Sequence, residues 1–249
     1  MIGTHKTASS KELGNERGLR QRLARFFVNR KGSTMTGNLG IGGVLTVGDS
    51  DNYTQTAADG TVTLAGTARV WKDMVLNPET LKLPGSNPPS LETYQNFPCH
   101  RYDKATEESV YYVWAVPHEF AVGDASVKGH YAFLVDNPPA AGGNVNVRMG
   151  FEYKKVSDSD VFTFAAGTTS GYVDEAIVEG EAAWTLHKTP DGTCTTTGWA
   201  TDDIILFRFF RKAADAADTY DDDGPLENDV WVLNYHLAYL VDKFGVDSA

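Results

Sequence analysis

Hydrophobic and polar residues alternate through most of the second half of the chain, which is the pattern of half-buried β-strands. Turn-rich segments, such as DNPPAAGG at 136–143 and KTPDGT at 188–193, separate the alternating stretches. The strands expected from this pattern span residues 109–116, 129–135, 144–153, 160–165, 171–178, 181–187, 202–210 and 229–240. Short strands at this spacing, without a strong helix between them, favour a mainly-β fold with an antiparallel, jelly-roll-like sandwich as a head domain over 109–249.

A second pattern, a repeat unit of six residues, lies nearer the N-terminus. It reads G-x-h-x-h-G, where h is aliphatic. Its units begin at Gly37 and Gly43 and return at Gly60 and, more weakly, at Gly66. The aliphatic positions of the first three units are Leu39, Ile41, Leu45, Val47, Val62 and Leu64. One unit buries too little surface to offset the entropy of ordering its backbone, about 1–2 kcal/mol per residue.

Repeats of this kind become stable by stacking on neighbours, and this chain has few of them. We therefore expect residues 33–70 to form a short glycine-rich β-repeat shaft, in which the aliphatic positions of three chains meet on a common axis. The sequence thus predicts that the protein associates with itself as a homotrimer. A glycine-rich β-hairpin within a monomer is the alternative that the sequence leaves open.

The first 32 residues predict an extended basic arm that contains a short helix. Within 15–29, leucine and phenylalanine recur at a helical spacing and form a narrow apolar stripe on a basic surface. A helix this short is marginal in water, so we expect it to order against a partner. The residues expected to anchor the arm are Arg17, Leu19, Arg20, Arg22, Leu23, Arg25, Phe26 and Phe27.

The segment between the shaft and the head, residues 71–108, carries five prolines and little periodicity. It predicts a proline-rich connector that runs over the surface of the head, with one short turn at 77–83. The alanine-rich KAADAAD at 212–218 is only two turns long, so a loop or a single turn is expected there.

Charge is unevenly distributed along the chain. The net charge is −11, but residues 1–32 hold eight Lys or Arg against two Glu, a local charge of +6 that leaves −17 on the remainder. This asymmetry indicates a basic arm that docks on an acidic assembly and a head that repels nucleic acid. No apolar run is long enough to insert into a membrane, and the N-terminus lacks the apolar stretch of a secretory signal.

Motifs for nucleotide binding, metallohydrolases and serine hydrolases do not occur, so the sequence predicts no cofactor, no metal and no catalytic residues. Cys99 and Cys194 are expected to be two buried thiols. His118 with Glu119, and Asn234 to His236, have a spacing that fits no metal signature, so structural histidines are favoured over a zinc site or an acid–base pair. The acidic run from 215 to 229 predicts a solvated loop, with calcium binding as the alternative.

Two further hypotheses concern carbohydrate. Aromatic residues are numerous in the head, and alternation places most of them in the core, but Trp199 in the turn-like GWAT is a candidate contact for a host surface glycan. Paired carboxylates would be needed for a polysaccharide depolymerase, and Glu152, Asp174 and Glu181 are the candidates in or near strands. We expect no enzymatic activity.

Several phrases carry a resemblance to bacteriophage proteins. TMTGNLGIGG at 34–43 resembles the GDxMTGxLxIxG-like phrase that opens the shaft of many tail-fibre proteins, with Met35, Thr36, Gly37, Leu39 and Gly42 matching and no aspartate before the Met. The stretches at 70–84, 106–135 and 206–237 are similar to a group of structural proteins of environmental phages.

This resemblance implies a trimeric β-sandwich protein on the exterior of a virion. The arm would then contact capsid, portal, collar or tail proteins, and the predicted function is that of a virion fibre or spike. A receptor-binding tip that recognises glycan is the alternative.

Overall fold

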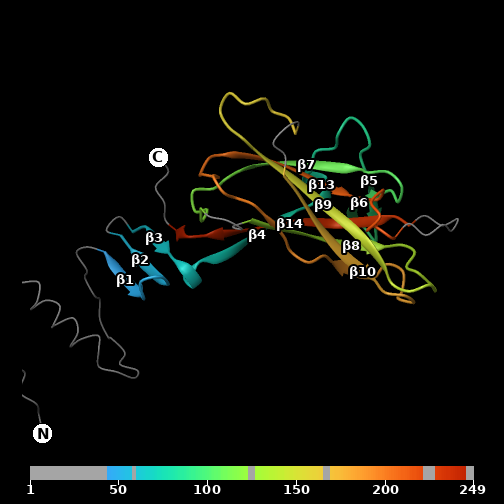
Figure 1. Ribbon diagram of the computed structural model, residues 1–249, viewed down its shortest axis with the longest axis horizontal. Helices are drawn as coiled ribbons and strands as arrows, with labels where there is room; N and C mark the ends of the chain where they lie inside the picture. Colours follow the sequence, from blue (N-terminus) through green and yellow to red (C-terminus); the bar gives the residue numbers. More distant parts are fainter. Residues whose placement is uncertain (1–43, 58–59, 123–126, 165–168, 221–227, 245–249) are drawn as a thin grey trace, which may run out of the picture. The chain divides into compact units, whose positions relative to one another are not determined.

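The computed structural model describes residues 44–57, 60–122, 127–164, 169–220 and 228–244 (Figure 1). In these ranges the regular structure is β-strand, apart from two 3₁₀ turns, η1 (Gly66–Ala68) and η2 (Pro78–Thr80). All strand pairs between the described strands are antiparallel. The prediction of a mainly-β, antiparallel protein is confirmed. The arm residues Arg17 to Phe27, and Leu39 and Ile41 of the first hexad, lie outside the described residues.

The larger of the two main sheets has seven strands. Its path runs β11 (Leu186–Lys188), β8 (Val127–Val135), β14 (Val230–Val241), β6 (Phe97–Tyr102) and β5 (Ser90–Tyr94), while β12 (Gly192–Cys194) pairs with β8 and β4 (Val70–Leu76) pairs with β14. Alternate residues of β14 are buried on either side of a register shift between Val232 and Asn234. A β-bulge of this kind re-aims the side chains next to it, here those of Leu233 and Asn234.

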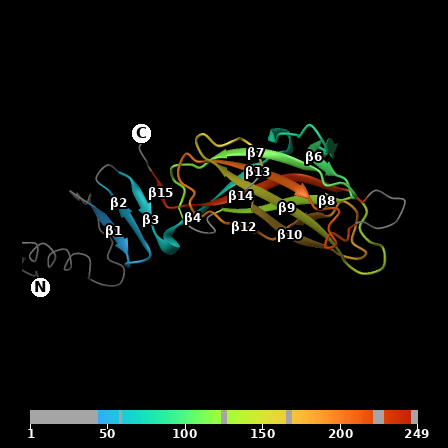
Figure 2. The same ribbon diagram turned by 45° about the horizontal axis from the view of Figure 1, so that its top comes forward.

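The second main sheet has four strands, in the order β10 (Thr169–Ile177), β9 (Val145–Val156), β13 (Ile204–Arg211) and β7 (Ser109–Ala115). Figures 1 and 2 show it lying against the seven-stranded sheet. Aromatic contacts join the two layers: the ring of Tyr131 on β8 lies 6.0 Å from that of Phe209 on β13, and Phe209 lies 5.2 Å from Tyr235 on β14. One continuous core of buried side chains therefore fills the space between the two sheets, which pack face to face as a sandwich.

A small third sheet contains two of the glycine hexads. Its order is β1 (Leu45–Gly48), β2 (Tyr53–Thr56), β3 (Val62–Leu64) and β15 (Lys243–Phe244). The hexads therefore fold back as a meander within their own chain, which is the pairing that the sequence left open as the hairpin alternative. β15 follows directly on β14 and pairs with β3, so the C-terminal strand completes a sheet begun near residue 45. No sequence pattern predicted that β15 would pair with β3.

Three secondary-structure predictions differ from the structure. The segment 71–108 was predicted as an irregular connector, but it contains strands. β5 and β6 lie within it and β4 begins at its edge, and all three belong to the seven-stranded sheet. Residues 160–164 form a loop with bends in place of the expected strand, since Ser157 and Asp160 close a turn immediately before it. Within 181–187 only the last two residues enter a strand, β11, because the N–H of Glu181 closes a turn with Val178 and that of Trp184 is taken by the carbonyl of Val135 on β8.

Two turn predictions agree with the structure. The short turn expected at 77–83 corresponds to η2. The alanine-rich segment at 212–218 forms consecutive turns, in which the backbone N–H of Asp215 donates to Lys212 and that of Asp218 donates to Asp215.

Candidate functional site

An apolar groove of about 480 Å³ lies on the seven-stranded sheet. Its floor and walls come from η2, the β5–β6 hairpin, β8, β11 and the bulge of β14. The lining residues are Asn77, Pro78, Tyr94, Gln95, Phe97, Pro98, Leu134, Leu186, Leu233 and Asn234. None of these side chains is ionisable near neutral pH, and three of them end in carboxamides.

The β5–β6 hairpin places two aromatic rings on this groove. Tyr94 and Phe97 are cross-strand partners, joined by the two-residue turn Gln95–Asn96. Both turn residues have positive φ, 51° and 71°, as the tightest hairpin turns require. The Phe97 side chain is 66% exposed, which is a large apolar surface to leave in water.

A tryptophan supports Tyr94 from the loop before β11. The ring of Trp184 stacks on that of Tyr94 with centroids 4.2 Å apart and planes 16° apart, and it meets Trp231 of β14 edge-on at 5.2 Å. Trp184 itself has a φ of 68°, an uncommon conformation for a bulky residue that its backbone hydrogen bond to Val135 helps to hold. The guanidinium of Arg101 lies 5.4 Å over the Trp231 ring. Tyr94 is therefore held in position by Trp184, which in turn packs on Trp231.

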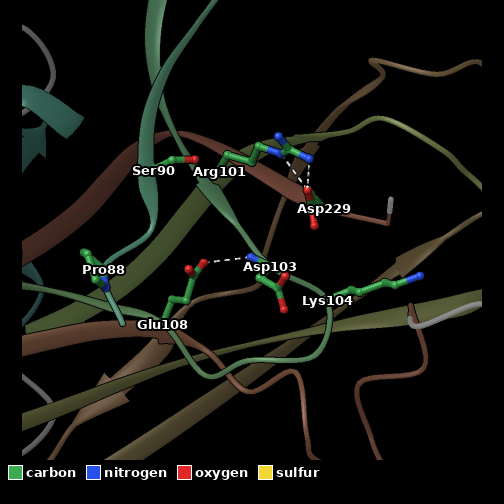
Figure 3. A pocket seen from close by; sticks show the side chains of 7 residues that line it. All are labelled: Pro88, Ser90, Arg101, Asp103, Lys104, Glu108 and Asp229. Atoms are coloured by element: carbon green, nitrogen blue, oxygen red, sulfur yellow. Dashed lines mark hydrogen bonds and ion pairs between the residues drawn. The ribbon is translucent and has the colours of Figure 1, made fainter. Parts of the chain in front are cut away.

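A second, polar hollow of about 290 Å³ lies near the other end of β6 (Figure 3). Arg101 Nε donates to Asp229 Oδ2 at 2.5 Å, and Glu108 Oε2 accepts from the backbone N–H of Asp103 at 2.7 Å. Burial raises the pKa of Glu108 above its ordinary value. In Figure 3 the Lys104 side chain extends away from the Arg101–Asp229 pair. Arg101 and Asp229 thus pair with each other, while the carboxylates of Glu108 and Asp103 accept from backbone N–H groups.

The described members of the predicted shaft core divide into exposed and covered positions. Leu45 and Val47 on β1 are 36% and 62% exposed, whereas Leu64 on β3 is 8% exposed and Val62 is half-buried. Strand β1 is also an edge strand, with β2 on one side only among the described strands. The two aliphatic side chains of β1 therefore lack cover within the part of the chain that the structure describes.

The prediction that Trp199 is an exposed glycan contact is wrong. Its side chain is 5% exposed and packs edge-on against Trp114 at 6.3 Å and Tyr153 at 5.8 Å. The backbone of the GWAT segment does form a turn, but the turn directs the indole into the core. A turn-like sequence indicates the backbone conformation, but it does not indicate whether the large side chain in the turn points into the core or into solvent.

The histidines named in the sequence do not converge on one site. His118 Nε2 lies 3.1 Å from Asp202 Oδ1, while Glu119 binds Lys72. His236 stacks on its cross-strand partner His130 with centroids 4.3 Å apart. Among the described residues no group of three or more His, Cys, Asp or Glu side chains is arranged to hold a metal ion. Cys99 and Cys194 are free and buried, as predicted.

The acidic run is not a uniformly solvated loop. Asp218 is buried and bound by Arg211, and Asp229 is buried and bound by Arg101. Asp215 pairs with Arg148 at 3.2 Å. Residues 221–227 lie outside the described residues.

The three candidate carboxylates for a depolymerase each have a basic partner. Glu152 pairs with Arg208 at 3.0 Å, Asp174 with Arg148 at 2.7 Å, and Glu181 with His187 at 2.9 Å. They lie on different elements and each is engaged in its own ion pair or hydrogen bond. The Arg148 guanidinium holds the pKa of Asp174 below its ordinary value, which favours a charged, structural carboxylate.

Three solved structures resemble this chain at low sequence identity. No protein-family model and no curated protein matches it. Among solved structures, dimeric latent PorU from Porphyromonas gingivalis matches over 69% of this chain and 13% of its own, with 7% identity and a TM-score of 0.29. TmCBM61 in complex with β-1,4-galactotriose matches over 70% of this chain and 86% of its own, with 11% identity and a TM-score of 0.24.

The VP1 pentamer of Human Polyomavirus 6 matches over 75% of this chain and 98% of its own, with 8% identity and a TM-score of 0.21. At such TM-scores these likenesses carry no argument about function. Within the described ranges there is no helix with the length and apolar character that crossing a membrane demands.

The two aromatic residues that define the groove, Tyr94 and Phe97, were not predicted as site residues. Tyr94 and Phe97 lie in the proline-rich stretch, where little periodicity is visible. The signal that was available is YQNF at 94–97, in which two aromatic residues flank a two-residue turn that contains Asn.

Proposed function

We propose that this chain is a structural, non-enzymatic protein of a bacteriophage virion, a homotrimeric fibre or spike displayed on the outside of the particle. Residues 1–32 attach it to a capsid, portal, collar or tail protein, and the β-sandwich is the head that faces outward. The phrase at 34–43 and the three body phrases that resemble phage structural proteins support the class of protein.

The observation that carries the proposal is the exposure of strand β1, whose four residues are all exposed in the part of the chain that the structure describes. Leu45 and Val47 project from the same side of an edge strand and are 36% and 62% exposed. A sheet with strands of only two to four residues gains little stability from so small an interior. Cover by the same strands of two sister chains would bury these side chains at about 25 cal/mol per Å².

The test compares two faces of one strand in the full-length protein. We expect the wild type to have the mass of a trimer by size-exclusion chromatography with light scattering, and the double variant Leu45→Asp, Val47→Asp to shift toward monomer. The control is Thr46→Asp, which adds a charge to the same strand on its opposite face and should remain trimeric. A monomeric wild type at micromolar concentration contradicts the proposal.

The location on a virion needs a separate test. A chain that lacks residues 1–32 should still form trimers but should be absent from purified particles, as measured by quantitative mass spectrometry against the major capsid protein. Incorporation at the wild-type level would show that the arm is not the anchor.

A further inference from the structure

We propose that the apolar groove formed by Tyr94, Phe97, Leu186 and Asn234 is a binding site for a neutral carbohydrate. The site is independent of trimer formation, because all of these residues belong to the seven-stranded sheet of one chain.

The aromatic side chains have the arrangement that a sugar ring requires. The C–H groups on one face of a pyranose carry partial positive charge and pack on the negative face of an aromatic ring. Phe97 offers such a face, since it is 66% exposed, and Tyr94 next to it is held by the stacked ring of Trp184 at 4.2 Å. A ring that is fixed before binding loses little conformational entropy when the ligand arrives.

The polar groups of the groove identify the ligand as neutral and rich in hydroxyls. Asn77, Gln95 and Asn234 supply carboxamides, each of which both donates and accepts hydrogen bonds, as hydroxyl groups do. Among the described residues, no side chain that is charged near neutral pH lines the groove. A charged ligand such as a phosphate ester would find no counter-charge on these lining residues and would lose its hydration.

Asn234 provides a second, independent observation. Its Oδ1 is buried and has no hydrogen-bond partner in the described part of the chain. An acceptor left in this state costs about 1–3 kcal/mol, so it calls for an explanation. The β14 bulge places Asn234 beside the groove, and rotation of its carboxamide toward the groove would let Oδ1 accept a hydrogen bond from a ligand hydroxyl.

The volume also agrees with a saccharide. Small-molecule sites in proteins are clefts of about 300–1,000 Å³ that are mostly apolar and carry a few polar groups. The groove, at about 480 Å³, falls in this range, and it is open to solvent along the exposed Phe97 and Leu186 side chains.

The test uses the full-length protein and three neutral trisaccharides, cellotriose, maltotriose and laminaritriose, with 3′-sialyllactose as a charged comparison. Binding is followed by intrinsic tryptophan fluorescence, because Trp184 contacts Tyr94 directly, and by isothermal titration. We expect at least one neutral trisaccharide to bind with a Kd at or below the low millimolar range, and the charged sugar to bind less well.

Variants locate the site. Phe97→Ala should weaken binding at least tenfold without unfolding the protein, since most of its ring is already in water. Trp71→Ala is the matched control: this ring is 43% exposed on β4 of the same sheet, is not part of the groove, and its removal should leave Kd unchanged. Asn234→Leu should also weaken binding, by loss of the carboxamide.

Either of two results overturns the proposal. One is the absence of binding by all three neutral trisaccharides at about 10 mM, a concentration about tenfold above a Kd of 1 mM. The other is binding that Phe97→Ala does not change. Light scattering on the same samples reports the oligomeric state separately, so a monomeric protein that still binds sugar would contradict the trimer and support this site.

Discussion

Arg211 and Asp218 form a bidentate ion pair in which both side chains are completely removed from solvent. Arg211 Nε donates to Asp218 Oδ2 and Nη2 donates to Oδ1, each at 3.0 Å. The same guanidinium also donates to the backbone carbonyls of Asn228 at 2.8 Å and Tyr220 at 2.6 Å. Arg211, at the end of β13, thereby binds the start of the acidic run and Asn228, shortly before β14.

Replacement of this arginine should destabilise the sandwich strongly. Arg211→Met leaves the Asp218 carboxylate buried and unpaired, and the loss of one partner of a buried pair costs about 3–5 kcal/mol in free energy of unfolding. Urea denaturation followed by tryptophan fluorescence measures it. Lys72→Met is the control, because the Lys72–Glu119 pair lies at the surface with Lys72 57% exposed, and its loss should cost less than about 1 kcal/mol. Equal losses in both variants would show that burial of the pair is unimportant.

Trp199 should prove a core residue rather than a ligand contact. It packs among Trp114, Phe120 and Tyr153, so Trp199→Ala should cost about 3–5 kcal/mol through the cavity it leaves. The measurement is the same denaturation experiment, with the exposed Trp71→Ala as the comparison. A variant as stable as the wild type would mean that the indole lies outside the core.

His100 should make the protein sensitive to mild acid. Its imidazole is buried beside the Tyr235 hydroxyl, with Nδ1 at 2.8 Å, and burial lowers the pKa of His100 to about 4 from its ordinary value near 6.5. The unfolded chain therefore takes up this proton at a higher pH than the folded chain. The contribution of His100 to the free energy of unfolding is fully present above about pH 6.5. It is lost as the pH falls toward 4, by about 1.4 kcal/mol per pH unit.

The variant His100→Gln isolates this contribution from that of the carboxylates. Its amide retains a polar group near Tyr235 but does not titrate. We expect a shallower decline in free energy of unfolding between about pH 6.5 and 4 than in the wild type, measured by urea denaturation at a series of pH values. Parallel curves for the two proteins would exclude His100 as the cause.

Gly192 should not accept a side chain without a loss of stability. A Cβ at this position on β12 would come within 2.7 Å of Phe151 Cζ and 3.0 Å of Val173 Cγ1, both in the core. Gly192→Ala should therefore cost about 1–3 kcal/mol through overpacking. Gly129→Ala on β8 is the matched control, because its nearest neighbour would be 3.5 Å away, an ordinary contact, and thermal denaturation of the two variants compares them directly. A loss of stability in Gly129→Ala as large as that in Gly192→Ala would contradict this explanation.

The β character of the head and most of its strands could be predicted from the amino-acid sequence alone. Residues such as Val230, Val232, Leu237 and Tyr239 are buried on alternate positions of β14, and an alternation of period two is visible without any knowledge of the partner strand. The burial of Cys99 and Cys194 also followed from residue type. These are local or nearly local properties.

Which segments pair, and which side chains lie inside, became known only from the packed fold. β4 was missed because its partner, β14, comes near the other end of the chain, and β15 was missed because two residues carry no pattern. Trp199 is buried although it belongs to a turn, and Phe97 is exposed although it is an aromatic residue on a strand. Strand pairing across long separations and the direction of a turn depend on the whole sandwich, so no short stretch of sequence contains them.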